Sequence, residues 1–148
     1  MRKGVLLLSF LFTTANLFAQ TTSEIDKVLG VWLNEDKDAK MEIFKSGNKY
    51  FGRLLWGSEI YEKDGKTPLK DTKNPDPKLR TRTRLNMVFM SDLSYDDGEY
   101  TGGKLYDARS GKTYGAKLTL KKLNNLEMRG YFGLSLFGQT VKWTRVSE

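Results

Sequence analysis

The sequence predicts an all-β fold, an antiparallel up-and-down (meander) β-barrel of about eight strands. Three observations support this prediction: alternating apolar and polar residues, glycine-containing hairpin turns, and no stretch suited to a long helix. The clearest alternation lies in residues 113–120, where one face carries Tyr114, Ala116, Leu118 and Leu120. A period of two is typical of a half-buried antiparallel strand, and Gly111 supplies the positive φ that a hairpin loop needs. Closing the meander into a barrel leaves no unpaired edge. A two-sheet sandwich is the alternative.

The predicted elements begin with a short helical turn at 23–29, where apolar residues share one side at helical spacing. Strands are expected at 30–33, 40–45, 49–56, 92–95, 99–107, 113–120, 126–132 and 139–146. Turns rich in glycine, asparagine and aspartate join most of them. The apolar residues 85–90 fit either a strand or a short helical turn. Residues 57–83 form the longest irregular stretch and contain all three prolines, and loops of this length are often functional or packed as a unit.

Residues 1–19 have the features of a secretory signal peptide, with a basic start and an apolar run. Cleavage is expected after Ala19 or after Ala15. Polar residues interrupt the apolar run well before the roughly 20 residues that a spanning helix needs, so no transmembrane segment is expected. Residues 20–148 then form a single β-barrel domain that is periplasmic or secreted. The chain has no cysteine, hence no lipobox for a lipid anchor.

Composition removes several classes of function. The chain has neither histidine nor cysteine, which excludes cysteine nucleophiles, serine–histidine triads and imidazole or thiolate metal sites. We therefore expect no enzyme activity, no cofactor and no metal. Arg2 and Lys3 contribute two of the seven net positive charges, so residues 20–148 carry +5. That balance suits an anionic envelope component, but the lysines are interspersed with acids, which is typical of solvated strand faces. No nucleic-acid partner is expected.

Motifs along nearly the whole mature chain resemble those of domain of unknown function 2147 (DUF2147), a family of exported bacterial proteins. In order, they are Gly30-x-Trp32, Gly52-Arg53-Leu54-Leu55-Trp56, Asp71-x-x-Asn74-Pro75-Asp76-Pro77-x-Leu79-Arg80, Gly102-Gly103-x-Leu105-Tyr106-Asp107, Gly111-Lys112-Thr113-Tyr114, Arg129-Gly130 and Trp143-Thr144-Arg145. The resemblance implies a small periplasmic β-barrel similar to lipocalins and other calycins. This chain departs from many relatives in lacking cysteines near Tyr50 and after Gly130, and from several in having Ala108 where they have proline. The family has no established activity, so no catalytic residue can be transferred.

The resemblance also implies a contact that closes the barrel. Lipocalin-like chains place the tryptophan of an opening Gly-x-Trp motif beside an arginine of the last strand, and Trp32 and Arg145 match that pattern. The guanidinium would stack on the indole face and join the first strand to the last. The alternative is that these are two unrelated residues of an ordinary sheet.

Six large side chains are expected to point inward: Trp56, Tyr106, Tyr114, Met128, Phe132 and Trp143. One interpretation is a pocket for an apolar or amphipathic ligand, lined by Trp56, Tyr106, Tyr114 and Trp143, with the tyrosine hydroxyls and Gln139 as polar anchors. The other is a filled core, which a chain of this size needs for its stability. The sequence leaves both open.

Three arginines form the most informative polar feature. Arg80, Arg82 and Arg84 alternate with threonines, so in an extended segment they would project to one side. They could clamp a phosphate or carboxylate, with Arg80 and Arg82 near the mouth of the barrel. They could equally form solvated ion pairs of little energetic value.

Two acidic features have simpler explanations than chemistry. Asp71, Asn74 and Asp76 place three oxygen ligands close together, which invites a calcium site, but Asn-Pro and Asp-Pro are ordinary turn starters. Asp107 could act as a general base, but an aspartate beside Ser110-Gly111 more simply holds the turn by accepting backbone N–H groups. We expect the turn role in both cases.

The residues favour an exported, non-enzymatic protein that binds a small hydrophobic or amphipathic ligand, such as a lipid-like molecule, inside the barrel. The alternative is an envelope structural or interaction protein with a filled barrel. It would contact a protein or an anionic polymer through the loop at 57–84.

Overall fold

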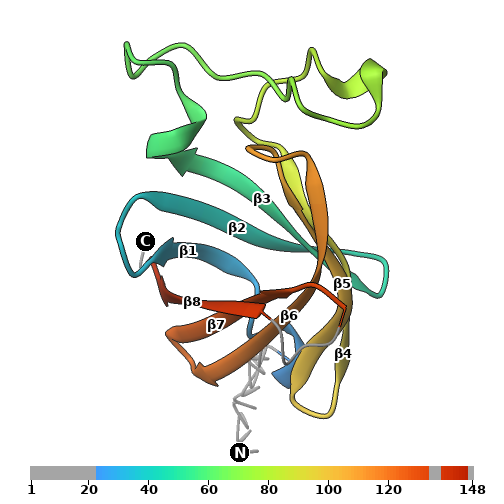
Figure 1. Cartoon of the computed structure of the whole chain (residues 1–148). Helices are drawn as coiled ribbons and strands as arrows, with labels where there is room; N and C mark the ends of the chain where they lie inside the picture. The colour runs from blue at the N-terminus through green and yellow to red at the C-terminus, as the bar shows by residue number, and fades with distance from the viewer. Residues whose placement is uncertain (1–22, 134–137, 147–148) are drawn as a thin grey trace, which may run out of the picture.

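The computed structural model describes residues 23–133 and 138–146, and within them it shows a closed antiparallel barrel. The strands are β1 (Gly30–Asn34), β2 (Ala39–Ser46), β3 (Lys49–Gly57), β4 (Val88–Asp96), β5 (Glu99–Asp107), β6 (Lys112–Lys122), β7 (Asn125–Tyr131) and β8 (Gly138–Arg145). Each strand pairs with the next, and β8 pairs with β1 (Figure 1). The predicted all-β meander barrel is confirmed. The leader expected at residues 1–19 lies outside the described residues.

The N-terminal segment plugs one end of the barrel. It contains the 3-10 turn η1 (Glu24–Asp26), and the hydroxyls of Tyr50 and Tyr100 both donate to the Ile25 carbonyl at 2.8 Å. Burial, and for Tyr50 the hydrogen bond to Asp26, raises the pKa of both phenols well above its usual value, so both remain donors. These bonds fix the plug to the inner wall of β3 and β5.

Trp32 and Arg145 lie side by side where the barrel closes. They are partners in the β1–β8 register, and the Arg145 guanidinium lies 4.3 Å from the Trp32 ring centroid. Arg145 also donates to the carbonyls of Leu29, at 2.7 Å, and Leu123, at 3.0 Å. Trp32 is fully buried and donates from Nε1 to the Val28 carbonyl at 3.0 Å. One arginine therefore ties the first strand, the last strand and the plug together.

Above the plug, the interior is filled rather than hollow. The largest side chains in this part of the core are almost completely buried: Trp32, Met41, Ile43, Met90, Leu93, Leu118, Leu126 and Trp143. Gly103 shows how closely the walls pack, since a Cβ there would lie 2.6 Å from the Leu93 side chain. A filled core of this kind was one of the two predicted outcomes, and it holds for this half of the barrel.

A β-bulge overturns the expected orientation of Trp56. Met41 faces Leu54, but the neighbouring Lys40 faces Trp56, so β3 carries one extra residue at this point. An extra residue moves the side chains that follow it to the opposite face of the sheet. Trp56 therefore shares the outer face with Lys40 and is 40% exposed, whereas we expected it to point inward.

Phe132 is the second correction to the inward set. It follows the end of β7 at Tyr131 and is 74% exposed. Because no ladder fixes its direction beyond the strand end, the period of two that placed Phe132 inside does not apply. Met128 and Trp143, by contrast, are buried in the core as expected.

A long loop, residues 58–87, joins β3 to β4 at the end of the barrel opposite the N-terminal plug (Figure 1). It contains the 3-10 turns η2 (Ser58–Ile60) and η3 (Pro77–Leu79). Of the apolar residues 85–90, the last three form the start of β4, which begins at Val88. The loop docks on the β5–β6 turn, where Gly111 has φ +73° and a Cβ would lie 2.1 Å from the Lys73 carbonyl oxygen. Glycine is required there both for the turn and for the close approach.

Candidate functional site

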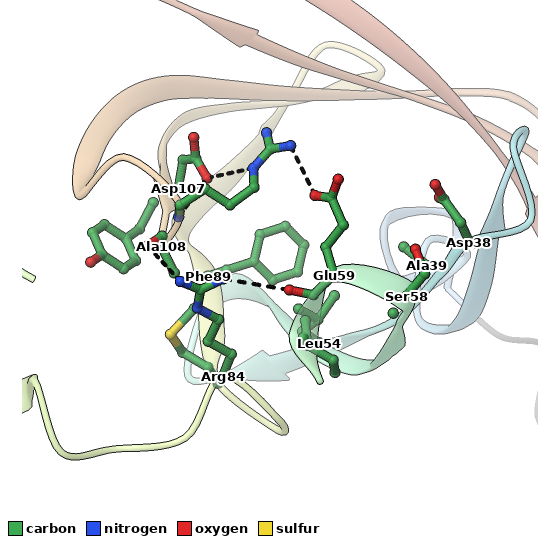
Figure 2. A pocket seen from close by; sticks show the side chains of 14 residues that line it. Asp38, Ala39, Leu54, Ser58, Glu59, Arg84, Phe89, Asp107 and Ala108 are labelled. Atoms are coloured by element: carbon green, nitrogen blue, oxygen red, sulfur yellow. Dashed lines mark hydrogen bonds and ion pairs between the residues drawn. The ribbon is translucent and has the colours of Figure 1, made fainter. Parts of the chain in front are cut away.

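The open end of the barrel is hollowed on the side of the long loop. A cavity of about 180 Å³ lies there, which we call the loop-side cavity (Figure 2). Its walls come from the ends of β2 to β5 and from both ends of the long loop. Its apolar residues are Ala39, Leu54, Ile60, Met87, Phe89 and Ala108, and its charged residues are Asp38, Glu59, Arg84, Asp107 and Arg109.

Arg109 links the long loop to the β5–β6 turn across the rim of this cavity. Its Nη1 lies 3.0 Å from Glu59 Oε2 and its Nε lies 3.1 Å from Asp107 Oδ1. Arg109 is exposed, so these ion pairs contribute little to stability. They do, however, engage two of the three carboxylates that line the cavity.

Asp107 holds the β5–β6 turn, as predicted. Its carboxylate accepts from the Arg109 backbone N–H at 3.0 Å and from the Ser110 hydroxyl at 3.0 Å. Partial burial tends to raise the pKa of Asp107, but these bonds and the Arg109 guanidinium outweigh burial and keep that pKa below its ordinary value. The carboxylate is thus a stable anion rather than a poised general base.

Arg84 spans the wall of the loop-side cavity without a carboxylate of its own. Its Nη1 donates to the Glu59 carbonyl at 3.4 Å and its Nη2 to the Ala108 carbonyl at 3.3 Å (Figure 2). Its Nε is buried and has no hydrogen-bond partner. Buried donors are nearly always paired, so this one requires an explanation.

A second cavity, of about 470 Å³, lies on the other side of the same end, and we call it the strand-side cavity. The ends of β5 to β8 line it, with the apolar residues Leu105, Tyr114, Met128, Tyr131, Phe132 and Val141 and the polar residue Gln139. Asp107 and Arg109 belong to the walls of both cavities. The open end is therefore one hollowed mouth divided by the Asp107–Arg109 pair.

The structure distributes the predicted pocket residues unevenly. Tyr106 lines the loop-side cavity and Tyr114 the strand-side cavity. Trp143 lies deeper in the packed core and lines neither of them, although its buried Nε1 also lacks a hydrogen-bond partner. Trp56 lies on the outer face. The four predicted residues therefore do not line one central pocket.

The three arginines do not act as one clamp, because the loop is not extended between them. Arg80 donates from Nε to the Asn74 carbonyl at 2.7 Å, directly after η3. Arg82 lies 2.9 Å from Asp71 Oδ2. Of the three, only Arg84 reaches the loop-side cavity.

Asp71 is the buried centre of the long loop. It has no exposed surface and accepts from the Tyr106 hydroxyl at 2.6 Å, Asn74 Nδ2 at 2.8 Å and Arg82. Burial tends to raise the pKa of Asp71, but these three donors together hold it below its ordinary value. Burial and the Asp71 carboxylate raise the pKa of Tyr106 to about 12, so this hydroxyl remains a donor.

The Asp71–Asn74–Asp76 group serves the turn, as predicted. Asn74 Oδ1 accepts from the Asp76 backbone N–H, and Asp76 Oδ1 accepts from the Lys78 backbone N–H, each at 2.9 Å. In the part of the chain that the structure describes, no three acidic, histidine or cysteine side chains are grouped to hold a metal ion.

A third cavity, of about 240 Å³, lies on the outer wall between the long loop and strands β4 to β6. We call it the outer-wall cavity. Arg82 and Lys104 line it together with Asn74, Ser91, Tyr106 and Thr113, and no carboxylate contributes to its walls. This cavity therefore has cationic walls without carboxylates, whereas the walls of the mouth include carboxylates.

Sequence reasoning missed several residues of the mouth, including Leu54, Glu59, Phe89 and Arg109. Only Arg109 carried a local signal, because it lies two residues after the turn aspartate Asp107. The others reach the cavity through the path of the long loop and the register of β3 and β4. A local sequence pattern predicts neither the path of the loop nor the register of these strands.

Comparisons with known proteins agree with the architecture. Residues 30–145 match the model of a family described as an uncharacterized protein conserved in bacteria, DUF2147. A solved structure, protein HP1028 from the human pathogen Helicobacter pylori, is described as belonging to the lipocalin family. It matches with 29% sequence identity and a TM-score of 0.72 over 82% of this chain and 84% of that one. No curated protein matches the chain. Over the described ranges, no helix is long and apolar enough to span a membrane.

Proposed function

We propose that this chain, which belongs to the DUF2147 family of bacterial proteins, is a non-catalytic protein that binds a small amphipathic ligand at the open end of its barrel. The observation that carries the proposal is the pair of adjoining cavities at that end, while the other end is plugged and packed. The lipocalin-like fold supports it, because β-barrels of eight strands can hold one small ligand where side chains do not fill the interior.

The composition of the mouth limits the class of ligand that it can bind. Apolar groups make up most of the wall surface of both cavities, as is usual for small-molecule sites, and charged side chains share the wall of the loop-side cavity. Trp143 and Met90 belong to the packed core and line neither cavity. The ligand therefore inserts only an apolar part and leaves its remainder at the rim.

Two features argue against chemistry at this site. The chain has no histidine or cysteine, and the pKa values of the nearby Asp71 and Asp107 carboxyls are lowered rather than raised. A general acid or base working near neutral pH needs a carboxyl pKa that is raised rather than lowered.

The protein would act in the periplasm or outside the cell after loss of residues 1–19, which N-terminal sequencing of the exported protein can test.

Filling the loop-side cavity should weaken binding. In Leu54→Trp the larger side chain occupies the loop-side cavity, so affinity for the neutral fluorescent probe N-phenyl-1-naphthylamine should fall about tenfold, the factor for 1.4 kcal/mol of lost contact. Fluorescence titration of the purified protein measures this. The matched control is Leu123→Trp at the 59% exposed Leu123 near the plugged end, which should bind like the wild type. Equal affinities in all three proteins would contradict a binding site in the mouth.

The outer-wall cavity favours a second candidate, contact with an anionic envelope polymer. The long loop carries eight basic and five acidic residues, and Arg82 and Lys104 both face a cavity without carboxylates. Lys104→Gln should then elute from immobilised lipopolysaccharide at lower salt than the wild type. Lys142→Gln on β8 is the control for loss of one charge. Identical elution of all three proteins would rule out this contact.

A further inference from the structure

We propose that Arg84 makes the loop-side cavity selective for small organic anions with an apolar body. The inference rests on the proposed function, because it names the class of ligand that this part of the mouth takes. It is carried by the hydrogen bonds and charges around one guanidinium (Figure 2).

Arg84 is a half-buried cation that its own protein leaves incompletely satisfied. Both of its hydrogen bonds, to the Glu59 and Ala108 carbonyls, are long at 3.4 and 3.3 Å. Its Nε–H is buried with no acceptor. It forms no ion pair with any residue in the ranges that the structure describes. A partly desolvated charge without a counter-charge is unfavourable.

The carboxylates that line the same cavity do not supply that counter-charge. Glu59 and Asp107 are both paired with Arg109. Asp38 accepts a hydrogen bond from Asn34 and lies across the cavity from Arg84 (Figure 2). An anionic group bound in the cavity would provide the missing charge, through the guanidinium N–H groups that suit arginine to carboxylate recognition.

The rest of the cavity sets the size of the ligand. Beside the guanidinium, the apolar side chains of Leu54, Met87 and Phe89 form the wall, and the cavity volume is about 180 Å³. An apolar protein cavity of about 150 Å³ holds one benzene molecule. The site therefore fits a carboxylate of about six carbons in all, such as hexanoate.

The neighbouring arginines show why this role belongs to Arg84. Arg82 is paired with the buried Asp71 carboxylate, and Arg80 donates to the Asn74 carbonyl. Neither lines the loop-side cavity. Arg80 thus provides a matched control: the same residue type, in the same loop, outside the cavity.

Titration calorimetry of the purified protein with hexanoate, 1-hexanol and hexylamine tests the inference. Hexanoate should bind at least about tenfold more tightly than 1-hexanol, which corresponds to one charge-assisted contact, and hexylamine should bind most weakly. Arg84→Gln should remove the preference, so that this variant binds hexanoate and 1-hexanol with equal affinity. Arg80→Gln should bind both ligands like the wild type.

The outcomes separate this inference from the function on which it rests. Equal wild-type affinity for hexanoate and 1-hexanol, or no hexanoate binding, overturns the anion selectivity, and this comparison needs no variant. Loss of selectivity in Arg80→Gln as well as in Arg84→Gln also overturns it. The mouth itself is tested by the neutral naphthylamine probe, so a positive probe titration with no hexanoate preference refutes only the role of Arg84.

Discussion

Trp32→Ala should lower the free energy of unfolding by about 4 kcal/mol, the largest effect expected of any single substitution in this barrel. The indole is fully buried and lies against both the plug and the Arg145 guanidinium. Its removal leaves a cavity at the seam between β1 and β8 and deprives the Val28 carbonyl of its donor. Urea denaturation followed by tyrosine and tryptophan fluorescence measures the loss.

Trp56→Ala is the matched control for this prediction. Trp56 is 40% exposed on the outer face of β3, so the same substitution should cost no more than about 1 kcal/mol. Similar losses in the two variants would mean that the seam contributes no special stability. Arg145→Lys adds a finer test, because lysine cannot donate to the Leu29 and Leu123 carbonyls with the geometry of a guanidinium fork.

The barrel was predictable from the sequence because its determinants are local. Alternation in 113–120 and the glycine turn at Gly111 follow from the period of two and from backbone sterics. Both are present in β6 and in the β5–β6 turn. The role of Asp107 was predictable for the same reason, since its hydrogen bonds reach only two and three residues along the chain.

The side of the wall that Trp56 faces was not predictable, because it depends on a partner strand. Alternation along β3 places Leu54 and Trp56 together, and only pairing with Lys40 and Met41 reveals the bulge between them. The same limit applies to the mouth. Phe89 and Arg109 line one cavity because β4 and the β5–β6 turn meet there, and a single sequence does not encode that meeting as a local pattern.

The arginine series shows how tertiary contacts separate residues that a pattern groups. Alternation predicted one clamp from Arg80, Arg82 and Arg84. Because Asp71 is buried in the same loop, Arg82 turns to it, whereas Arg84 turns to the mouth. A candidate anion site remains, but it is built on one arginine rather than three.

Asp71→Ala should destabilise the protein by about 3 kcal/mol, because it leaves Tyr106, Asn74 and Arg82 without their common acceptor. The released loop should also be cut faster by trypsin, which has eight basic residues to attack within 58–87. Asp64→Ala removes an exposed carboxylate that hydrogen-bonds only within the same loop, so it should cost about 1 kcal/mol or less. Equal losses in the two variants would contradict a central role for Asp71.

The pH dependence gives Asp71 a signature that a packing defect would not produce. The pKa of Asp71 in the folded protein lies below its ordinary value near 3.9. The stability that its charge contributes is therefore fully present above about pH 5 and is lost as the pH falls through the folded-state pKa. The difference in unfolding free energy between wild type and Asp71→Asn should be constant from about pH 5 to 8 and shrink below about pH 4. A difference that does not change with pH would assign the effect to shape alone.

The same substitution should also weaken ligand binding at a distance. Within the described part of the chain, Tyr106 is the one residue of the mouth that hydrogen-bonds to the Asp71 carboxylate, yet the loop that Asp71 anchors carries Glu59 and Arg84 into the wall of the loop-side cavity. If the buried carboxylate holds that wall in place, Asp71→Asn should bind the neutral naphthylamine probe more weakly than Asp64→Ala does at neutral pH. Unchanged probe binding in a variant with a trypsin-sensitive loop would show that the cavity forms without the loop, and that β2 to β5 alone shape the site.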